Sequence, residues 1–315
     1  MLTRRRFTTA AFATVAGTST IGWHASALSS DNKLGGLAET FAKIEADSGG
    51  RLGVGLLDTG TGATAGHRED ELFPMCSTFK LLCAAAILAR VDAGKEQLAR
   101  RIPVTSADLL DYAPVTKQHT GSDMTVAELC EAAVTLSDNT AANLLLASMG
   151  GPSAITEYAR AIGDGITRLD RTEPELNTAE AGDARDTTTP KAMARNLHTL
   201  TIGTALSSAS REQLNNWLVG CKTGDAKLRA GLPKDWRIGD KTGSGSHGTR
   251  NDIAVVWPTS RAPVMITVYL TQTTTDEDKR NAIFAAIGKT VAATTWPFLS
   301  TIHGNISAGR AAGAK

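Results

Sequence analysis

The sequence predicts an α/β fold of two lobes, in which a five-stranded antiparallel sheet with flanking helices carries an inserted all-α lobe. Two observations lead to this prediction. Strand-like patterns open and close the chain, whereas helical patterns joined by loops fill its middle, from Ser77 to about Leu218. The strand-like segments follow one another through short turns, and strands joined in this way are antiparallel. A chain of 315 residues is long enough for this arrangement.

The expected elements follow in chain order. Residues 31–47 carry apolar side chains at helical spacing, and Gly49-Gly50 ends that helix. The expected strands are residues 52–57, 63–67, 237–246, 252–257 and 264–271, and a closing helix covers residues 276–293. We therefore expect an α/β lobe from residues 28–68 and 220–303 and an all-α lobe from residues 69–219. A cleft between two lobes is a natural place for a ligand.

The two ends of the chain are expected to lie outside the fold. Thr3-Arg4-Arg5-Arg6-Phe7 is a basic start, a mildly apolar run follows, and Ala25-Ser26-Ala27 is a cleavage sequence. This pattern is typical of a twin-arginine signal peptide over residues 1–27, which predicts export to the periplasm or the medium. An ordinary secretory signal is the alternative. Residues 304–315 are rich in Gly and Ala, which predicts a disordered tail.

Composition excludes several kinds of partner. The net charge is +1, which gives no reason to expect nucleic acid, and no apolar run after the signal is long enough for a membrane anchor. The four cysteines form no C-x-x-C pair and no cluster with histidine, so we expect no metal. The predicted protein is a monomer that takes a small molecule and needs no cofactor.

The candidate nucleophile lies in Ser77-Thr78-Phe79-Lys80. The run after it, Leu81 to Ala89, is apolar on every face, as in a buried helix. Positions i and i+3 share a helix face, so the amine of Lys80 can reach the oxygen of Ser77. A lysine in a dry pocket can lose its charge and take the proton of the serine. The motif alone is weak, because a second S-x-x-K near the N-terminus has no such helix behind it.

Two triplets follow that carry polar groups suited to a cleft. Ser137-Asp138-Asn139 lies between two apolar helical patterns, where Ser137 could relay a proton and Asn139 bind substrate; a helix cap is the structural alternative. Lys241-Thr242-Gly243 lies on an expected strand that glycines leave bare, so that a ligand can lie along it. A second copy, Lys222-Thr223-Gly224, lies between helical patterns and is set aside.

A helix-poor segment from Arg168 to Thr189 is a further candidate, because loops of this length are often functional. Glu173 and Asn177 are four residues apart, so one helical turn would point both at the same water molecule. Arg171 and Asp186 could pair as a staple of this loop. A charged surface loop is the structural alternative.

Together these motifs resemble those of the class A serine β-lactamases, and the similarity extends over about residues 31–296. The motifs that carry it, in order, are Ser77-x-x-Lys80, Ser137-Asp138-Asn139, Glu173-x-x-Leu176-Asn177 and Lys241-Thr242-Gly243. The resemblance implies the two-lobed fold of serine β-lactamases and penicillin-binding proteins. It also implies hydrolysis of β-lactam antibiotics through a serine acyl-enzyme, and hence β-lactam resistance, without a cofactor or a metal.

The resemblance further implies a role for each site residue. Ser77 attacks the lactam carbonyl, and either Lys80 or Glu173 acting through a water takes its proton. Ser137, with Lys241 beside it, passes a proton to the lactam nitrogen, and Glu173 then activates the water that attacks the acyl-enzyme. The residues implied for substrate binding are Tyr112, Asn139, Asn177, Thr242, Gly243, Ser244 and Arg250. The N–H groups of Ser77 and Ser244 would form the oxyanion hole.

The cysteines depart from the family's pattern. Many members bridge two buried helices, and Cys130 matches one half of that bridge. Cys83 stands one residue before the other half, about 100° around a helix, so we expect no Cys83–Cys130 disulfide. Some carbapenem-hydrolysing members place a cysteine where this chain has Gly245, opposite Cys76. Carbapenem hydrolysis therefore has no support in the sequence.

Two other functions share most of these residues. A D-alanyl-D-alanine peptidase would keep the serine, the lysine and the bare strand but should lack the pair Glu173 and Asn177. A β-lactam sensor would be acylated without turnover, and it would need a membrane segment after the signal.

Overall fold

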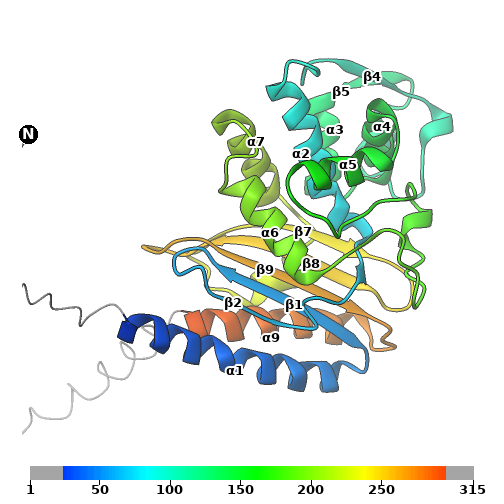
Figure 1. Cartoon of the computed structure of the whole chain (residues 1–315). Helices are drawn as coiled ribbons and strands as arrows, with labels where there is room; N and C mark the ends of the chain where they lie inside the picture. The colour runs from blue at the N-terminus through cyan, green and yellow to red at the C-terminus, as the bar shows by residue number, and fades with distance from the viewer. Residues whose placement is uncertain (1–23, 296–315) are drawn as a thin grey trace, which may run out of the picture.

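A five-stranded antiparallel sheet, with strand order β2-β1-β9-β8-β7, organises the computed structural model, which describes residues 24–295 (Figure 1). Its strands are β1 (Arg51–Asp58), β2 (Thr64–His67), β7 (Arg237–Ser244), β8 (Arg250–Trp257) and β9 (Val264–Thr271). The predicted sheet is thus confirmed. Because β1 pairs with β9 over its whole length, the first and last parts of the chain meet in the middle of the sheet.

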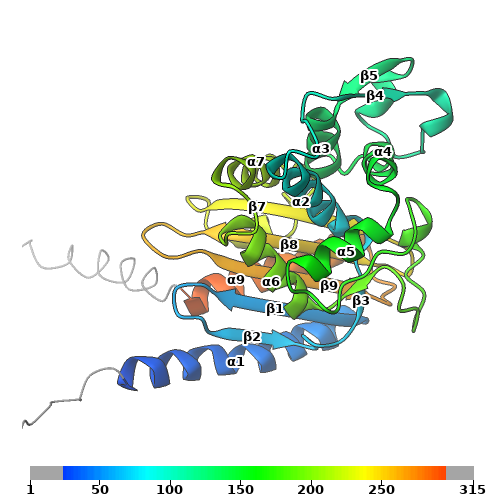
Figure 2. The same cartoon turned by 45° about the horizontal axis from the view of Figure 1, so that its top comes forward.

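Two helices, α1 (His24–Ser48) and α9 (Glu277–Thr295), cover one face of the sheet (Figures 1 and 2). Phe41 and Phe284 are buried there in one cluster with Val256 and Val268 of the sheet. Helix α1 begins before the expected residue 31, because no Gly or Pro interrupts residues 24–30. Its first residues overlap the expected cleavage sequence.

The other face of the sheet carries the second lobe (Figure 2). Its helices are α2 (Phe79–Asp92), α3 (Val126–Thr135), α4 (Asn139–Met149), α5 (Ser153–Ala161), α6 (Pro190–Thr201) and α7 (Ser208–Val219). Residues of β8 alternate between the two cores: Ile253 and Val255 join the cluster of this lobe, whereas Ala254 and Val256 join the opposite one. Helix α6 can lie close to β1 because Gly55 has no side chain. A Cβ at Gly55 would come within 2.8 Å of the carbonyl oxygen of Pro190.

Two small pairs of strands accompany the helices of this lobe. Strand β3 (Phe73–Pro74) pairs with β6 (Thr187–Thr188), and β4 (Arg101–Val104) pairs with β5 (Ser122–Thr125). The first pair joins the segment just before Ser77 to the end of the loop formed by residues 168–189. A short helix, α8 (Leu228–Gly231), precedes β7. The lobe boundaries at residues 68/69 and 219/220 stay predictions.

Several expectations concern the ends of the chain. Residues 1–23 of the expected signal peptide and the expected disordered tail, 304–315, lie outside the described residues. Among residues 24–295, no helix is both long and apolar enough to cross a membrane.

Candidate active site

Ser77 lies at the start of the buried helix α2, on a single 3-10 turn, Cys76–Thr78. Cys76 has a φ of 44°, which turns the chain sharply just before the nucleophile. Asn251 of β8 holds this turn, because its side-chain amide donates to the carbonyl oxygen of Met75 at 2.8 Å. Ser77 is only 7% exposed, so its hydroxyl lies in a nearly closed site.

The buried amine of Lys80 joins the nucleophile to the rest of the site. Its Nζ lies 2.9 Å from Ser77 Oγ, 2.6 Å from Asn139 Oδ1 and 3.0 Å from Glu173 Oε1. It also donates to the carbonyl oxygen of Ser137 at 2.9 Å. Burial lowers the pKa of Lys80, and the carboxylate of Glu173 opposes part of that shift. Such an amine exchanges a proton more readily than an exposed lysine does.

The carboxylate of Glu173 faces Ser77 from the 168–189 loop. Ser77 Oγ donates to Glu173 Oε1 at 3.1 Å, and the side-chain amide of Asn177 donates to the other carboxylate oxygen. The peptide bond between Glu173 and Pro174 is cis. The predicted turn between Glu173 and Asn177 is a 3-10 helix, η4 (Glu175–Asn177). Glu173 and Asn177 therefore do converge, as their spacing predicts.

The predicted staple of this loop is present and largely buried. Arg171 Nε donates to Asp186 Oδ2 at 2.5 Å, and the Asp186 side chain is 1% exposed. Asp186 Oδ1 also accepts from the backbone N–H groups of Asp170 and Arg171, at 2.7 and 2.9 Å. Because these groups are shielded from water, the pair contributes more to stability than an exposed ion pair would.

Asn143 is a site residue that the sequence analysis missed. Its side-chain amide donates to the carbonyl oxygen of Glu173 at 2.8 Å, and its Oδ1 accepts from the N–H of Glu173 at 2.9 Å. One side chain thus fixes both backbone polar groups of the residue that carries the carboxylate. The signal was available: Asn143 follows Asn139 by four residues on α4, which places both on one helix face.

If Glu173 aligns the attacking water, as the resemblance implies, Asn143→Ala should slow the turnover of a β-lactam roughly 100-fold, because a displacement of the carboxylate by about an ångström disrupts that alignment. Steady-state and single-turnover kinetics would measure this. Asn215→Ala is the matched control, since Asn215 also donates to a backbone carbonyl, that of Thr201, at 3.0 Å. Equal turnover in the two variants would show that Asn143 does not position Glu173.

Ser137 and Lys241 meet on the opposite side of the nucleophile. Lys241 Nζ donates to Ser137 Oγ at 3.0 Å and to the carbonyl oxygen of Thr242 at 2.7 Å. Asp138 caps α4 and also accepts from Thr116, which is the structural interpretation of the triplet. The functional interpretation of Ser137 and Asn139 stays a prediction. Burial lowers the pKa of Lys241 to about 8, and the nearby amine of Lys80 acts in the same direction.

The residues implied for substrate binding come from several elements: Thr242, Gly243 and Ser244 lie on β7, Arg250 begins β8, Asn139 begins α4, and Asn177 ends η4. Tyr112 is half exposed, and its carbonyl oxygen accepts from the N–H of Asn139 at 3.0 Å. A Cβ at Gly243 would come within 2.8 Å of the Met75 carbonyl oxygen, which explains the bare strand. Ser244 is exposed and pairs in register with Arg250. The Arg250 guanidinium is held by Glu277, with Nε 2.9 Å from Oε2, a contact that the sequence did not predict.

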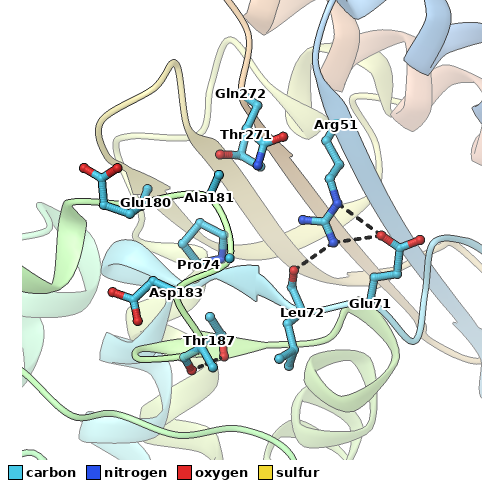
Figure 3. A pocket seen from close by; sticks show the side chains of 13 residues that line it. Arg51, Glu71, Leu72, Pro74, Glu180, Ala181, Asp183, Thr187, Thr271 and Gln272 are labelled. Atoms are coloured by element: carbon cyan, nitrogen blue, oxygen red, sulfur yellow. Dashed lines mark hydrogen bonds and ion pairs between the residues drawn. The ribbon is translucent and has the colours of Figure 1, made fainter.

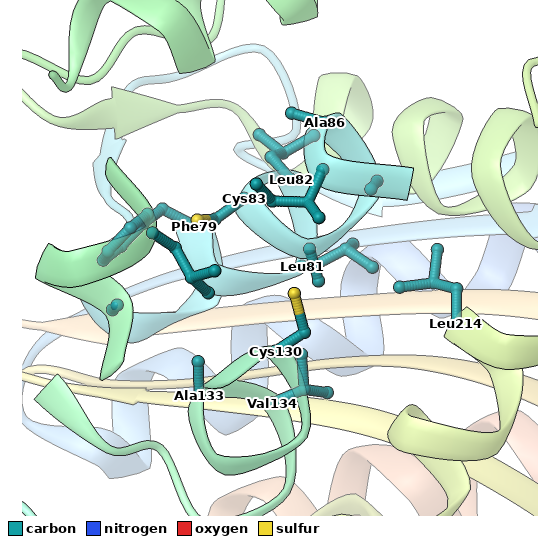
Figure 4. Packing of buried hydrophobic residues seen from close by; sticks show 14 of the residues in the cluster. Phe79, Leu81, Leu82, Cys83, Ala86, Cys130, Ala133, Val134 and Leu214 are labelled. Carbon is teal, nitrogen blue, oxygen red and sulfur yellow. The ribbon is translucent and has the colours of Figure 1, made fainter. Parts of the chain in front are cut away.

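The four cysteines are all buried and unpaired. Cys83 and Cys130 lie on α2 and α3, in the apolar cluster shown in Figure 4. Cys76 packs against Gly245, where a Cβ would lie 2.7 Å from the sulfur and equally close to the carbonyl oxygen of Asn177. That carbonyl also accepts from the N–H of Ser246 at 2.9 Å, so the strand end and the loop are in contact.

A cavity of about 420 Å³ opens behind the loop (Figure 3). Arg51, Leu72, Pro74, Asp183 and Thr271 are among its lining residues, and the candidate catalytic residues are not. Within residues 24–295, no cluster of three or more His, Cys, Asp or Glu side chains is arranged to hold a metal ion.

A buried serine within hydrogen-bond reach of a lysine and a carboxylate, between a sheet and a helical lobe, defines a serine hydrolase that works by acyl transfer. Comparison identifies the family: the chain belongs to the class A β-lactamases. A model of the β-lactamase enzyme family matches residues 36–295.

Individual relatives agree with this assignment. The chain is 51% identical to β-lactamase CTX-M-8 of Citrobacter amalonaticus, over 80% of this chain and 87% of the relative. It is 48% identical to β-lactamase L2 of Stenotrophomonas maltophilia, over 92% and 98% of the two chains. The solved structure of an ancestral class A β-lactamase matches with a TM-score of 0.81 and 64% identity, covering 81% of this chain and 98% of that one.

Proposed function

We propose that this protein hydrolyses β-lactam antibiotics, and thereby confers resistance, through an acyl-enzyme on Ser77 that Glu173 helps to hydrolyse. The observation that carries the proposal is the position of the Ser77 hydroxyl, which bonds to both Lys80 and Glu173. A serine in this setting can lose its proton during attack and regain it when the ester is cleaved.

Acylation begins when Ser77 Oγ attacks the lactam carbonyl and the ring C–N bond breaks. The O–H of Ser77 points at Glu173, whereas Lys80 donates to Ser77, so the ground state favours Glu173 as the first proton acceptor. Lys80 can serve in its place once it is neutral. Ser137, whose hydroxyl accepts from Lys241, would then protonate the departing nitrogen.

Deacylation uses the carboxylate of Glu173 together with the side chain of Asn177. Glu173 and Asn177 hold a water, Glu173 takes its proton, and the hydroxide adds to the ester carbonyl. The ester C–O bond then breaks and Ser77 recovers its proton. Asn139, Thr242, Gly243, Ser244 and Arg250 would hold the substrate beside β7, with Tyr112 at the entrance. We also propose that a signal peptide, residues 1–27, directs export of the protein and that the mature protein is a monomer.

Mass spectrometry of the purified mature protein mixed with a penicillin tests the proposal. Rapid ring opening, with no lasting adduct on Ser77, is the expected result, and Ser77→Ala should be inactive. A stable adduct on the wild-type protein would overturn the proposal and leave the peptidase or the sensor. Amino-terminal sequencing of the exported protein tests the cleavage after residue 27.

The pKa of Lys241 predicts a decline of kcat/KM at alkaline pH. The amine is a cation below its pKa of about 8 and neutral above it, so the field that attracts a carboxylate is lost as the pH rises through 8. A pH profile from 6 to 10 measures this. Lys241→Arg keeps its charge over that range and should lose the decline near pH 8. An unchanged profile in this variant would assign the decline to another group.

A further inference from the structure

The second Lys-Thr-Gly triplet lies directly behind the first. Thr223 Oγ1 is 2.5 Å from Thr242 Oγ1 on β7, a contact that no sequence pattern predicts. Gly224 allows this close approach, because a Cβ there would overlap a carboxylate oxygen of Asp240. Lys227 holds the segment from the other side, since its amine donates to the carbonyl oxygen of Thr223 at 3.2 Å.

The direction of this hydrogen bond matters for binding. A threonine hydroxyl has one proton to donate, and a carboxylate can only accept. If Thr242 donates its proton to the carboxylate of a substrate, it cannot also donate to Thr223. The bond between the two hydroxyls must then run from Thr223 to Thr242.

We propose that Thr223 is a positioning residue of the carboxylate subsite: it donates to Thr242 and so directs the proton of Thr242 toward the carboxylate of the substrate. This inference rests on the proposed function, because it needs a β-lactam whose carboxylate lies against Thr242. It gives the second triplet a role in substrate binding without contact between Thr223 and the substrate.

The hydroxyl pair continues to Cys221, whose sulfur lies 3.3 Å from Thr223 Oγ1. Burial raises the pKa of this thiol to about 11, so it keeps its proton at neutral pH. A thiol can accept from Thr223 or donate to it. In the free enzyme the hydrogen bond between Thr223 and Thr242 can therefore run in either direction. An anionic ligand selects the direction in which Thr223 donates and the proton of Thr242 faces the cleft.

Steady-state kinetics with a penicillin test the inference. Thr223→Val removes the donor while keeping the shape, and it should raise KM about fivefold, the loss of one neutral hydrogen bond, with kcat nearly unchanged. Thr223→Ser keeps the hydroxyl and should restore KM. In a Thr242→Val background, Thr223→Val should have no further effect, because Thr223 acts only through Thr242.

A matched control is present in the sheet. Thr249 and Thr271 form another buried hydroxyl pair, with their Oγ1 atoms 2.7 Å apart. Thr271→Val removes one hydroxyl of that pair and should keep the KM of the wild-type enzyme. Should Thr223→Val fail to fold, Thr223→Ala makes the same comparison.

Three outcomes would overturn the inference. One is an unchanged KM in Thr223→Val; another is an equal rise in both backgrounds, which would mean direct contact with the substrate. The third is a failure of Thr223→Ser to restore KM, which would assign the effect to packing. Loss of the proposed function itself would look different, because the wild-type enzyme would then not turn over penicillin at all.

Discussion

Glu173→Ala is expected to accumulate a stable penicilloyl ester on Ser77 and to lower steady-state turnover roughly 10³-fold. The reason is geometric: the Glu173 carboxylate accepts from Ser77 Oγ at 3.1 Å and from the Asn177 amide, so its removal leaves the ester without a base to activate water. Mass spectrometry and peptide mapping would locate the adduct.

The control for this variant is Glu175→Ala, an exposed carboxylate in the same loop, which should turn over penicillin normally and show no adduct. The rate of adduct formation in Glu173→Ala settles the acylation base. A large decrease assigns that step to Glu173, and an unchanged rate assigns it to Lys80. If Glu173→Ala turned over like the control, Glu173 would not be the deacylation base.

Lys80→Met is expected to reduce kcat/KM roughly 10³-fold and also to destabilise the protein. The side chains of Lys80 and Glu173 are fully buried, with 3.0 Å between Nζ and Oε1. Removing the cation leaves a buried carboxylate without its partner, which costs about 3–5 kcal/mol of unfolding free energy. Urea denaturation and steady-state kinetics measure the two effects.

A double variant separates stability from catalysis. Lys80→Met with Glu173→Gln leaves no unpaired charge, so it should recover most of the lost unfolding free energy while remaining inactive. If Lys80→Met alone were as stable as the wild-type protein, the charge pair would not contribute to folding in the way its burial indicates.

The sheet and the buried helix α2 could be predicted because their patterns are local. Short, mostly apolar runs bounded by turn residues mark the strands, and the continuous apolar run after Ser77 marks the helix. The convergence of Glu173 and Asn177 was predictable for the same reason, since residues four apart lie on one face of a helical turn.

The contacts that the sequence did not reveal join residues far apart in the chain. Asn143 holds Glu173 from another helix, Thr223 reaches Thr242 from a loop, and Glu277 holds Arg250. Each is an ordinary polar residue in its own segment, and only the tertiary packing within its lobe brings it to the site. The triplet containing Thr223 is the clearest example of a contact that local sequence patterns do not predict, because its own pattern indicates no more than a loop.

The contact between the end of β7 and the catalytic loop constrains how this enzyme can change under selection. Ser246 binds the carbonyl oxygen of Asn177 at 2.9 Å, and any side chain at Gly245 would press on that same carbonyl. A mutation at Gly245 that reshapes the entrance for bulkier antibiotics therefore also moves Asn177, the residue proposed to hold the deacylating water. Adaptation through this position must trade substrate range against turnover, unless a second change readjusts the loop.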